Sequence, residues 1–255
     1  MRLEGQKNGR KRKFPSRWPF AGLLLLFFSF GLHAEVLPQA LASAQKAYSL
    51  ARSNYLASPR ETEAAAALTR ACFELSELST DNERKSALAQ EGIAAARFVS
   101  QMAPDNAEGF LFLALNSGEL ARTKSIGALS LLRQMEKALL QAAKLKPHLD
   151  HAGPDRSLGQ LYFEAPGWPV SLGSKRKARE HLEQATELEP DYPDNHLSLL
   201  EAYVRWNDPA VQEGIDRYRT VLPDAKKKYS GPEWEQAWHD WDERWDAIQR
   251  KTKAD

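Results

Sequence analysis

The chain has 255 residues, of which 35 are basic and 34 acidic, so its formal net charge at pH 7 is +1. Seven of the basic residues and one acidic residue lie within residues 1–34, and without that segment the net charge becomes −5. Nothing in this charge balance indicates nucleic-acid binding, and the basic cluster belongs to residues 1–34. The single cysteine, Cys72, excludes an intramolecular disulfide, and its apolar surroundings (TRACFELSEL) predict a buried, unreactive thiol.

Residues 1–34 have the layout of a secretory signal peptide. A basic segment precedes the uncharged run 20–32 (FAGLLLLFFSFGL). At about 1.5 Å per residue this run reaches about 20 Å, which is less than the roughly 30 Å of a bilayer's hydrocarbon core. Cleavage after Ala34 predicts a periplasmic mature chain without membrane contact. The large Leu32 at the minus-three position leaves an uncleaved inner-membrane anchor as the alternative.

The remaining sequence predicts an all-α protein, because apolar residues recur at intervals of three and four and alternating strand patterns are almost absent. Asp81 and Asn82 are expected to cap a helix, Pro154 suits a first helical turn, and Ser230 with Glu233 forms a potential capping box. The expected helices span residues 38–57, 60–79, 82–102, 107–122, 126–146, 154–164, 173–189, 193–206, 209–221 and 231–250.

Four prolines, Pro104, Pro147, Pro190 and Pro223, are each preceded by the same pattern. Small or apolar residues stand twelve, eight and five positions before each of them: Gly92, Ala96 and Val99; Met135, Leu139 and Ala142; Ala178, Leu182 and Ala185; and Val211, Ile215 and Tyr218. This internal repeat predicts units that each end in a helix halted by proline. The proline spacings of 43, 43 and 33 indicate that two units carry extra residues between their helices.

The motif L-G-x2-Y at Leu158, Gly159 and Tyr162 and the motif A-x3-L-x2-A-x4-P from Ala178 to Pro190 resemble the tetratricopeptide signature. Around them, AEGFLFLALNSGELA, SIGALSLLRQMEKALLQAAKLKP, GPDRSLGQLYFEAPGWPVSLGSKRKA and EPDYPDNHLSLLEAYV resemble the periplasmic TRAP-transporter-associated TatT component family and, more distantly, the regulator of microtubule dynamics proteins. The resemblance covers about residues 85–225. It implies a soluble periplasmic partner of an extracytoplasmic solute-binding protein, in some cases oligomeric.

These observations predict a tetratricopeptide-like α-α superhelix, a solenoid of antiparallel helix pairs with a capping C-terminal helix. The expected organisation is a signal peptide at 1–34, an N-terminal helical cap at 35–80, a repeat region at 81–229 and a tryptophan-rich capping helix at 230–255.

In a tetratricopeptide unit the first helix lines the concave face, which defines a candidate binding groove. The groove positions are Glu108, Leu111, Leu115, Arg156, Gln160, Phe163, Leu197, Glu201, Val204 and Arg205. Their mixture of apolar and charged types suits a partner segment or an amphipathic ligand. An ordinary solvated helix face is the alternative interpretation.

Tryptophans mark two further sites. Trp168, in the turn APGWP, is expected to be either a plug packed on the adjacent repeat or a lip of the groove. Trp234, Trp238, Trp241 and Trp245 are spaced four, three and four residues apart, which predicts one aromatic face on the last helix. That face either seals the end of the solenoid or forms an interface with another chain.

Catalytic, cofactor and metal signals are weak. His148, Asp150 and His151 (HLDH) offer potential ligands, but no HExxH, paired CxxC, Walker A, GxSxG or dinucleotide-binding motif occurs. We therefore expect a non-enzymatic exported scaffold or adaptor that binds a protein, with a TRAP-type solute-binding protein as the expected partner. The alternatives are a carrier of a hydrophobic small molecule in a helical cavity and an oligomeric assembly protein.

Overall fold

The computed structural model describes residues 37–124, 127–167 and 170–254, and all of them fall in one compact unit, Gly31–Asp255. The described residues are all-α, as predicted, with one isolated bridge between Gly167 and Gly173. Their helices are α1 (Pro38–Ala57), α2 (Thr62–Glu77), α3 (Asn82–Met102), α4 (Ala107–Arg122), α5 (Ala128–Leu145), α6 (Gly153–Glu164), α7 (Lys175–Leu188), α8 (Pro193–Arg205), α9 (Val211–Lys228), the 3-10 turn η3 (Pro232–Trp234) and α10 (Glu235–Ala254). The expected signal peptide and Trp168 lie outside the described residues.

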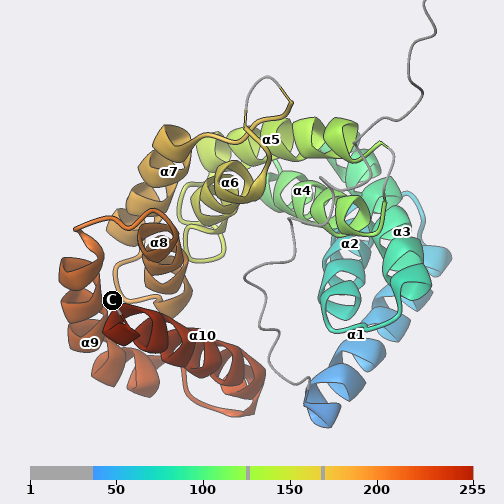
Figure 1. Ribbon diagram of the computed structural model, residues 1–255. Helices are drawn as coiled ribbons and strands as arrows, with labels where there is room; N and C mark the ends of the chain where they lie inside the picture. Colours follow the sequence, from blue (N-terminus) through green and yellow to red (C-terminus); the bar gives the residue numbers. More distant parts are fainter. Residues whose placement is uncertain (1–36, 125–126, 168–169, 255) are drawn as a thin grey trace, which may run out of the picture. The chain divides into compact units, whose positions relative to one another are not determined.

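Consecutive helices pack as pairs, α2 with α3, α4 with α5, α6 with α7 and α8 with α9, and each pair also contacts the next (Figure 1). The chain ends in α10, which packs on α8. The expected boundary between an N-terminal cap and the repeats, at residue 80, falls between the paired helices α2 and α3. None of the helices in the described part of the chain is both long enough and apolar enough to span a membrane.

Three of the four prolines end their helices in the same way. The residues just before Pro104, Pro147 and Pro190 have φ/ψ of −133°/77°, −152°/84° and −132°/74°, and each helix ends one residue earlier. The following proline disfavours the α conformation at these positions, because its ring collides with the backbone of the preceding residue. The repeated sequence pattern therefore produces a repeated helix ending.

Pro223 does not end its helix, so the prediction of a stop at residue 221 is wrong. Helix α9 continues through Pro223 to Lys228, although proline cannot donate the hydrogen bond to the carbonyl four residues earlier. Beyond the proline, Ala225 is fully buried and Tyr229 is 2% exposed in the C-terminal core. We attribute the continuation to this burial, which offsets the cost of an interior proline.

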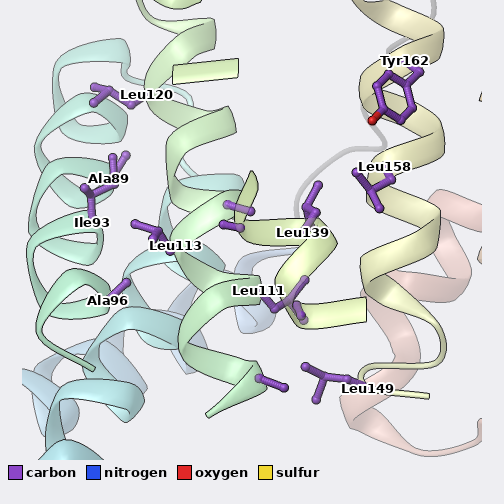
Figure 2. Close-up of a cluster of buried hydrophobic side chains, with 14 of the residues drawn as sticks. Ala89, Ile93, Ala96, Leu111, Leu113, Leu120, Leu139, Leu149, Leu158 and Tyr162 are labelled. Carbon is purple, nitrogen blue, oxygen red and sulfur yellow. The ribbon is translucent and has the colours of Figure 1, made fainter. Parts of the chain in front are cut away.

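The positions twelve, eight and five before the prolines form much of the core. Leu139, Leu182 and Ala96 are completely inaccessible to solvent. Figure 2 shows how Ala96, Leu111, Leu139 and Leu158 contribute to one cluster between neighbouring helices. Small residues let the helices approach closely: a Cβ on Gly159 would lie 2.5 Å from Cγ of Leu182. Close packing of this kind joins the two helices of one repeat unit.

Other local predictions had mixed outcomes. Asp81 caps α3 by accepting a hydrogen bond from the Glu83 amide at 2.9 Å, as expected, whereas Asn82 is the first residue of the helix. Pro154 lies in the first turn of α6, also as expected. The predicted capping box is wrong, because Gly231 occupies the N-cap of the 3-10 turn and makes no side-chain cap.

The expected insertions between paired helices are present in only one of the two longer units. Ten residues, 165–174, connect α6 to α7, whereas only residues 123–127 connect α4 to α5. In the unit formed by α4 and α5 the additional residues lie in the helices themselves. These helices have 16 and 18 residues, whereas α6 and α7 have 12 and 14.

Candidate functional site

A row of polar contacts joins α6 to α8 along their length. Arg156 Nε lies 3.1 Å from Asp194 Oδ2, Gln160 Nε2 donates to Ser198 Oγ at 3.0 Å, and Arg205 Nη1 donates to Glu164 Oε1 at 3.3 Å. We call these three pairs the polar ladder. On α6 its members are spaced by four residues, so one face of the helix carries them all. The ladder therefore fixes α6 and α8 side by side through one continuous polar seam.

Helix α10 extends this seam through Arg244. The guanidinium donates to both carboxylate oxygens of Glu201 at 2.8 and 3.1 Å, to Asp194 at 2.6 Å and to Ser198 at 3.2 Å. Burial alone would lower the pKa of Arg244, but the carboxylates of Glu201 and Asp194 raise it well above its usual value. Burial alone would raise the pKa of Asp194, but Arg244 and Arg156 lower it. Both residues are therefore charged throughout the neutral range.

The ladder becomes more accessible toward the C-terminal ends of its helices. The side chains of Arg156 and Asp194 are 10% and 20% exposed, whereas those of Arg205 and Glu164 are 29% and 28% exposed. At this outer pair the Arg205 guanidinium also lies 4.4 Å from the centre of the half-buried Phe163 ring. An aromatic surface flanked by an acidic and a basic group is suited to holding an amphipathic protein segment.

The predicted groove residues divide into three groups. Arg156, Gln160, Glu201 and Arg205 come together as members of the polar seam. Leu111 and Leu197 are wrong as groove-lining residues, because both are completely buried in the hydrophobic core (Figure 2 shows Leu111). Glu108, Leu115, Phe163 and Val204 are half-buried, and Glu108 pairs with Arg70 of α2 at 3.1 Å.

Sequence reasoning missed four residues of the seam: Glu164, Asp194, Ser198 and Arg244. A usable signal was present in α8, where Asp194, Ser198, Glu201 and Arg205 are spaced by four, three and four residues. That spacing marks one polar face on the helix. It gives no indication of whether such a face meets solvent, a partner or another helix of the same chain.

The tryptophans near the C-terminus pack against their own chain. Trp241 is 3% exposed, and Trp234, Trp238 and Trp245 are half-buried around a cluster with Tyr192, Tyr218 and Tyr229. Trp238 Nε1 donates to the Tyr229 carbonyl at 2.5 Å. Trp234 lies in the 3-10 turn, so it departs from the expected single helical stripe, yet its ring centre is 6.0 Å from that of Trp241. This arrangement packs the indoles of α10 and the 3-10 turn against residues of α8 and α9, as a terminal cap requires.

The HLDH segment forms a turn whose side chains have other partners. His148 Nδ1 lies 2.9 Å from Glu189 Oε1, and the His151 ring stacks on Tyr192 with 4.3 Å between ring centres. Within the part of the chain that the structure describes, no three His, Cys, Asp or Glu side chains approach closely enough to hold a metal ion. The geometry of this turn therefore gives no support to a metal site.

Two other features bear on ligand chemistry. An open surface hollow of about 430 Å³ on α3 and the end of α4 is lined by Asn82, Glu83, Ser86, Ala87, Gln90 and Thr123. Cys72 is completely buried, and this burial, followed by the nearby Glu91 carboxylate, raises the pKa of its thiol to about 12. Neither the hollow nor the thiol offers an apolar ligand cavity or a nucleophile active at neutral pH.

Comparison with known proteins agrees with this architecture. The family model described as regulator of microtubule dynamics protein 1-3 matches residues 33–153, which is just under half of the chain. None of the curated proteins matches the chain. A crystal structure of a thermophilic tetratricopeptide-repeat protein from Thermus thermophilus matches at 20% sequence identity with a TM-score of 0.58, covering 83% of this chain and 93% of that chain.

The chain is a tetratricopeptide-like helical-repeat protein. At 20% identity the structural likeness establishes the fold, while the ligand depends on the surface residues of this chain. The family match begins at residue 33, so it includes α1 and α2, which lie before the region of resemblance seen in the sequence. The matched region therefore includes both helices of the expected N-terminal cap.

Proposed function

We propose that the protein is a non-enzymatic, exported scaffold that binds another protein, and that its partner is the solute-binding protein of a TRAP-type transporter. Export is supported by the basic and apolar pattern of residues 1–34. The choice of partner is supported by the resemblance of the repeat segments to TRAP-associated proteins. The binding role is supported by the tetratricopeptide-like fold, which stacks helices and presents their first-helix faces side by side.

The observation that carries the binding role is the outer pair of the polar ladder. Glu164, Arg205 and the ring of Phe163 are partly exposed at one place, and their opposite charges and apolar surface are complementary to an amphipathic segment. The inner pair of the ladder is less accessible. We therefore place the partner contact at the C-terminal ends of α6 and α8.

The two alternatives receive less support. A carrier of a hydrophobic molecule would need apolar groove residues such as Leu111, Phe163 and Leu197 to line a cavity, but Leu111 and Leu197 are core residues. Phe163 packs edge-on against Trp206 with 5.7 Å between ring centres. Assembly through the tryptophan face requires exposed indoles, whereas Trp241 is 3% exposed and Trp234, Trp238 and Trp245 are half-buried against their own chain.

A binding measurement with purified proteins tests this proposal. The solute-binding protein of a TRAP transporter from the same organism is titrated with the mature chain and with two charge-reversal variants, Arg205→Glu and Arg217→Glu. Arg217 lies on α9 and is 56% exposed in a pair with Glu213, so it provides a charge-matched control away from the ladder. We expect saturable binding that Arg205→Glu weakens at least tenfold and Arg217→Glu leaves unchanged.

Two results would count against different parts of the proposal. Equal weakening by both reversals would show that the contact is not at the ladder. Failure of the solute-binding protein to bind, together with retention of a different periplasmic protein that depends on Arg205, would reject the TRAP partner and keep the scaffold role.

A further inference from the structure

The turn between α5 and α6 contains three consecutive residues in the left-handed conformation, none of them glycine. Asp150, His151 and Ala152 have φ values of 50°, 53° and 60°. This conformation is unfavourable for a residue with a Cβ atom, and three in succession need support from their surroundings. The His151 carbonyl supplies part of it by accepting hydrogen bonds from Arg156 Nη1 at 3.0 Å and from Asn195 Nδ2 at 3.1 Å.

The conformation of this turn places the His151 imidazole against the C-terminal aromatic cluster. The ring stacks on Tyr192 with an angle of 13° between ring planes, and it meets Tyr229 and Trp234 edge-on at centre distances of 5.4 and 6.2 Å. Tyr192 precedes α8, Tyr229 follows α9, and Trp234 belongs to the 3-10 turn. One histidine ring thus connects the α5–α6 turn to three segments of the C-terminal core.

Burial opposes protonation of the imidazole, while the charges around it act in both directions. Asp150 and Glu189 favour the protonated form, whereas Arg156 and Lys228 disfavour it, and burial is the largest influence, so the pKa of His151 lies below its ordinary value of 6.5. The aromatic neighbours offer little compensation through cation–π contacts. Arg156 already lies 5.1 Å from the Tyr192 ring centre and Lys228 lies 5.1 Å from that of Tyr229, so a charged imidazole would be a third cation there.

We propose that the contact between His151 and Tyr192 is pH-sensitive, and that uptake of a proton by the imidazole loosens the C-terminal aromatic cluster from the α5–α6 turn. The expected direction follows from linkage. Below about pH 6.5 the unfolded chain binds a proton at this histidine more readily than the folded chain does. The free energy of unfolding therefore falls as the pH drops toward the pKa of His151 in the folded chain. Each unit of difference between the pKa of His151 in the unfolded chain and its pKa in the folded chain corresponds to a tenfold change in the unfolding equilibrium.

A second histidine, His196, is buried and also destabilises the fold on acidification, so its contribution must be measured separately from that of the half-buried His151. His196 Nε2 lies 2.7 Å from the Pro190 carbonyl oxygen, and burial lowers its pKa despite this contact and despite Asp191, with Arg217 adding to the decrease. His148 provides a matched control, because it lies three residues before His151, its side chain is 61% exposed, and its ring pairs with Glu189 at the surface.

The test follows urea unfolding of the mature chain between pH 8 and pH 5 by tryptophan fluorescence, which reports on Trp234 beside the histidine and on Trp241 beside Trp234. We expect the unfolding midpoint to fall on acidification in the natural protein and in His148→Gln, and to fall measurably less in His151→Gln. His196→Gln measures the contribution of the second histidine. An unchanged pH dependence in His151→Gln would overturn the proposal.

If His151→Gln does not fold, an NMR titration of the imidazole in the natural protein replaces it. A folded-state midpoint clearly below 6.5 for His151, accompanied by shifts of the Tyr192 and Trp234 ring protons, supports the pH-sensitive contact. A midpoint at or above 6.5 would refute it.

Discussion

Replacement of Arg244 by methionine tests whether the polar seam holds α10 on α8. The guanidinium donates four hydrogen bonds to Asp194, Ser198 and Glu201, and its side chain is 14% exposed. Methionine keeps most of the apolar stem and removes the charge. The change leaves the carboxylate of Glu201 in a mostly buried position without its main partner.

The size of the effect follows from the partners that remain. Breaking a buried ion pair by removing one partner costs about 3–5 kcal/mol. Asp194 keeps Arg156 at 3.1 Å, so we expect a value at the lower end, about 3 kcal/mol. For a chain of this size each kcal/mol lowers the melting temperature by about 2–4 °C, which gives a decrease of roughly 6–12 °C.

Thermal and guanidinium unfolding, followed by circular dichroism and tryptophan fluorescence, measure this loss. Arg217→Met is the control, because Arg217 forms an exposed pair with Glu213 on one helix, and such pairs contribute about 0.3–0.5 kcal/mol. In a double-mutant cycle Glu201→Gln should lose much of its effect once Arg244 is absent. The reasoning fails if Arg244→Met is no more destabilising than Arg217→Met, or if the two changes at Arg244 and Glu201 are additive.

Three further changes have definite expected outcomes. Gly159→Ala should destabilise the chain by about 1–3 kcal/mol in thermal unfolding, because the added Cβ would approach Leu182 to 2.5 Å. The control Gly118→Ala should be neutral or slightly stabilising, because its Cβ would meet the flexible Met135 side chain, with the sulfur at 3.3 Å. Pro223→Ala should raise the melting temperature, because an interior proline costs a helix about 3 kcal/mol and alanine restores the missing backbone N–H donor. An unchanged or lower melting temperature would contradict our account of α9. Cys72 should resist iodoacetamide at pH 8.5 until urea unfolds the chain, as its raised pKa of about 12 and complete burial require, and rapid labelling of the folded protein would show otherwise.

The repeat was readable from the sequence because its signal is local. A proline restricts the residue before it, so the positions of Pro104, Pro147 and Pro190 determine three helix endings without help from distant residues. The same rule failed at Pro223, where burial of Ala225 and Tyr229 extends the helix. A tertiary contact there outweighs a strong local preference.

The candidate site was only partly readable, because its chemistry depends on pairing across helices. Arg156 and Asp194 are 38 residues apart in the chain, and Arg244 is 43 residues from Glu201. The spacing of polar residues in one helix shows which face they share, but it does not show what that face meets. For the same reason Leu111 and Leu197, on helices correctly identified, were assigned to a surface when they belong to the core.

The sequence by itself determined the all-α class, the repeat period and most helix boundaries, since helical periodicity and proline stereochemistry act within a few residues. Only the tertiary structure decided which polar residues are partners, where α10 is attached, and why His151 faces the aromatic cluster. These outcomes depend on burial and on distances between segments far apart in the chain. The electrostatic and packing energies that follow from them exist only once the helices have come together.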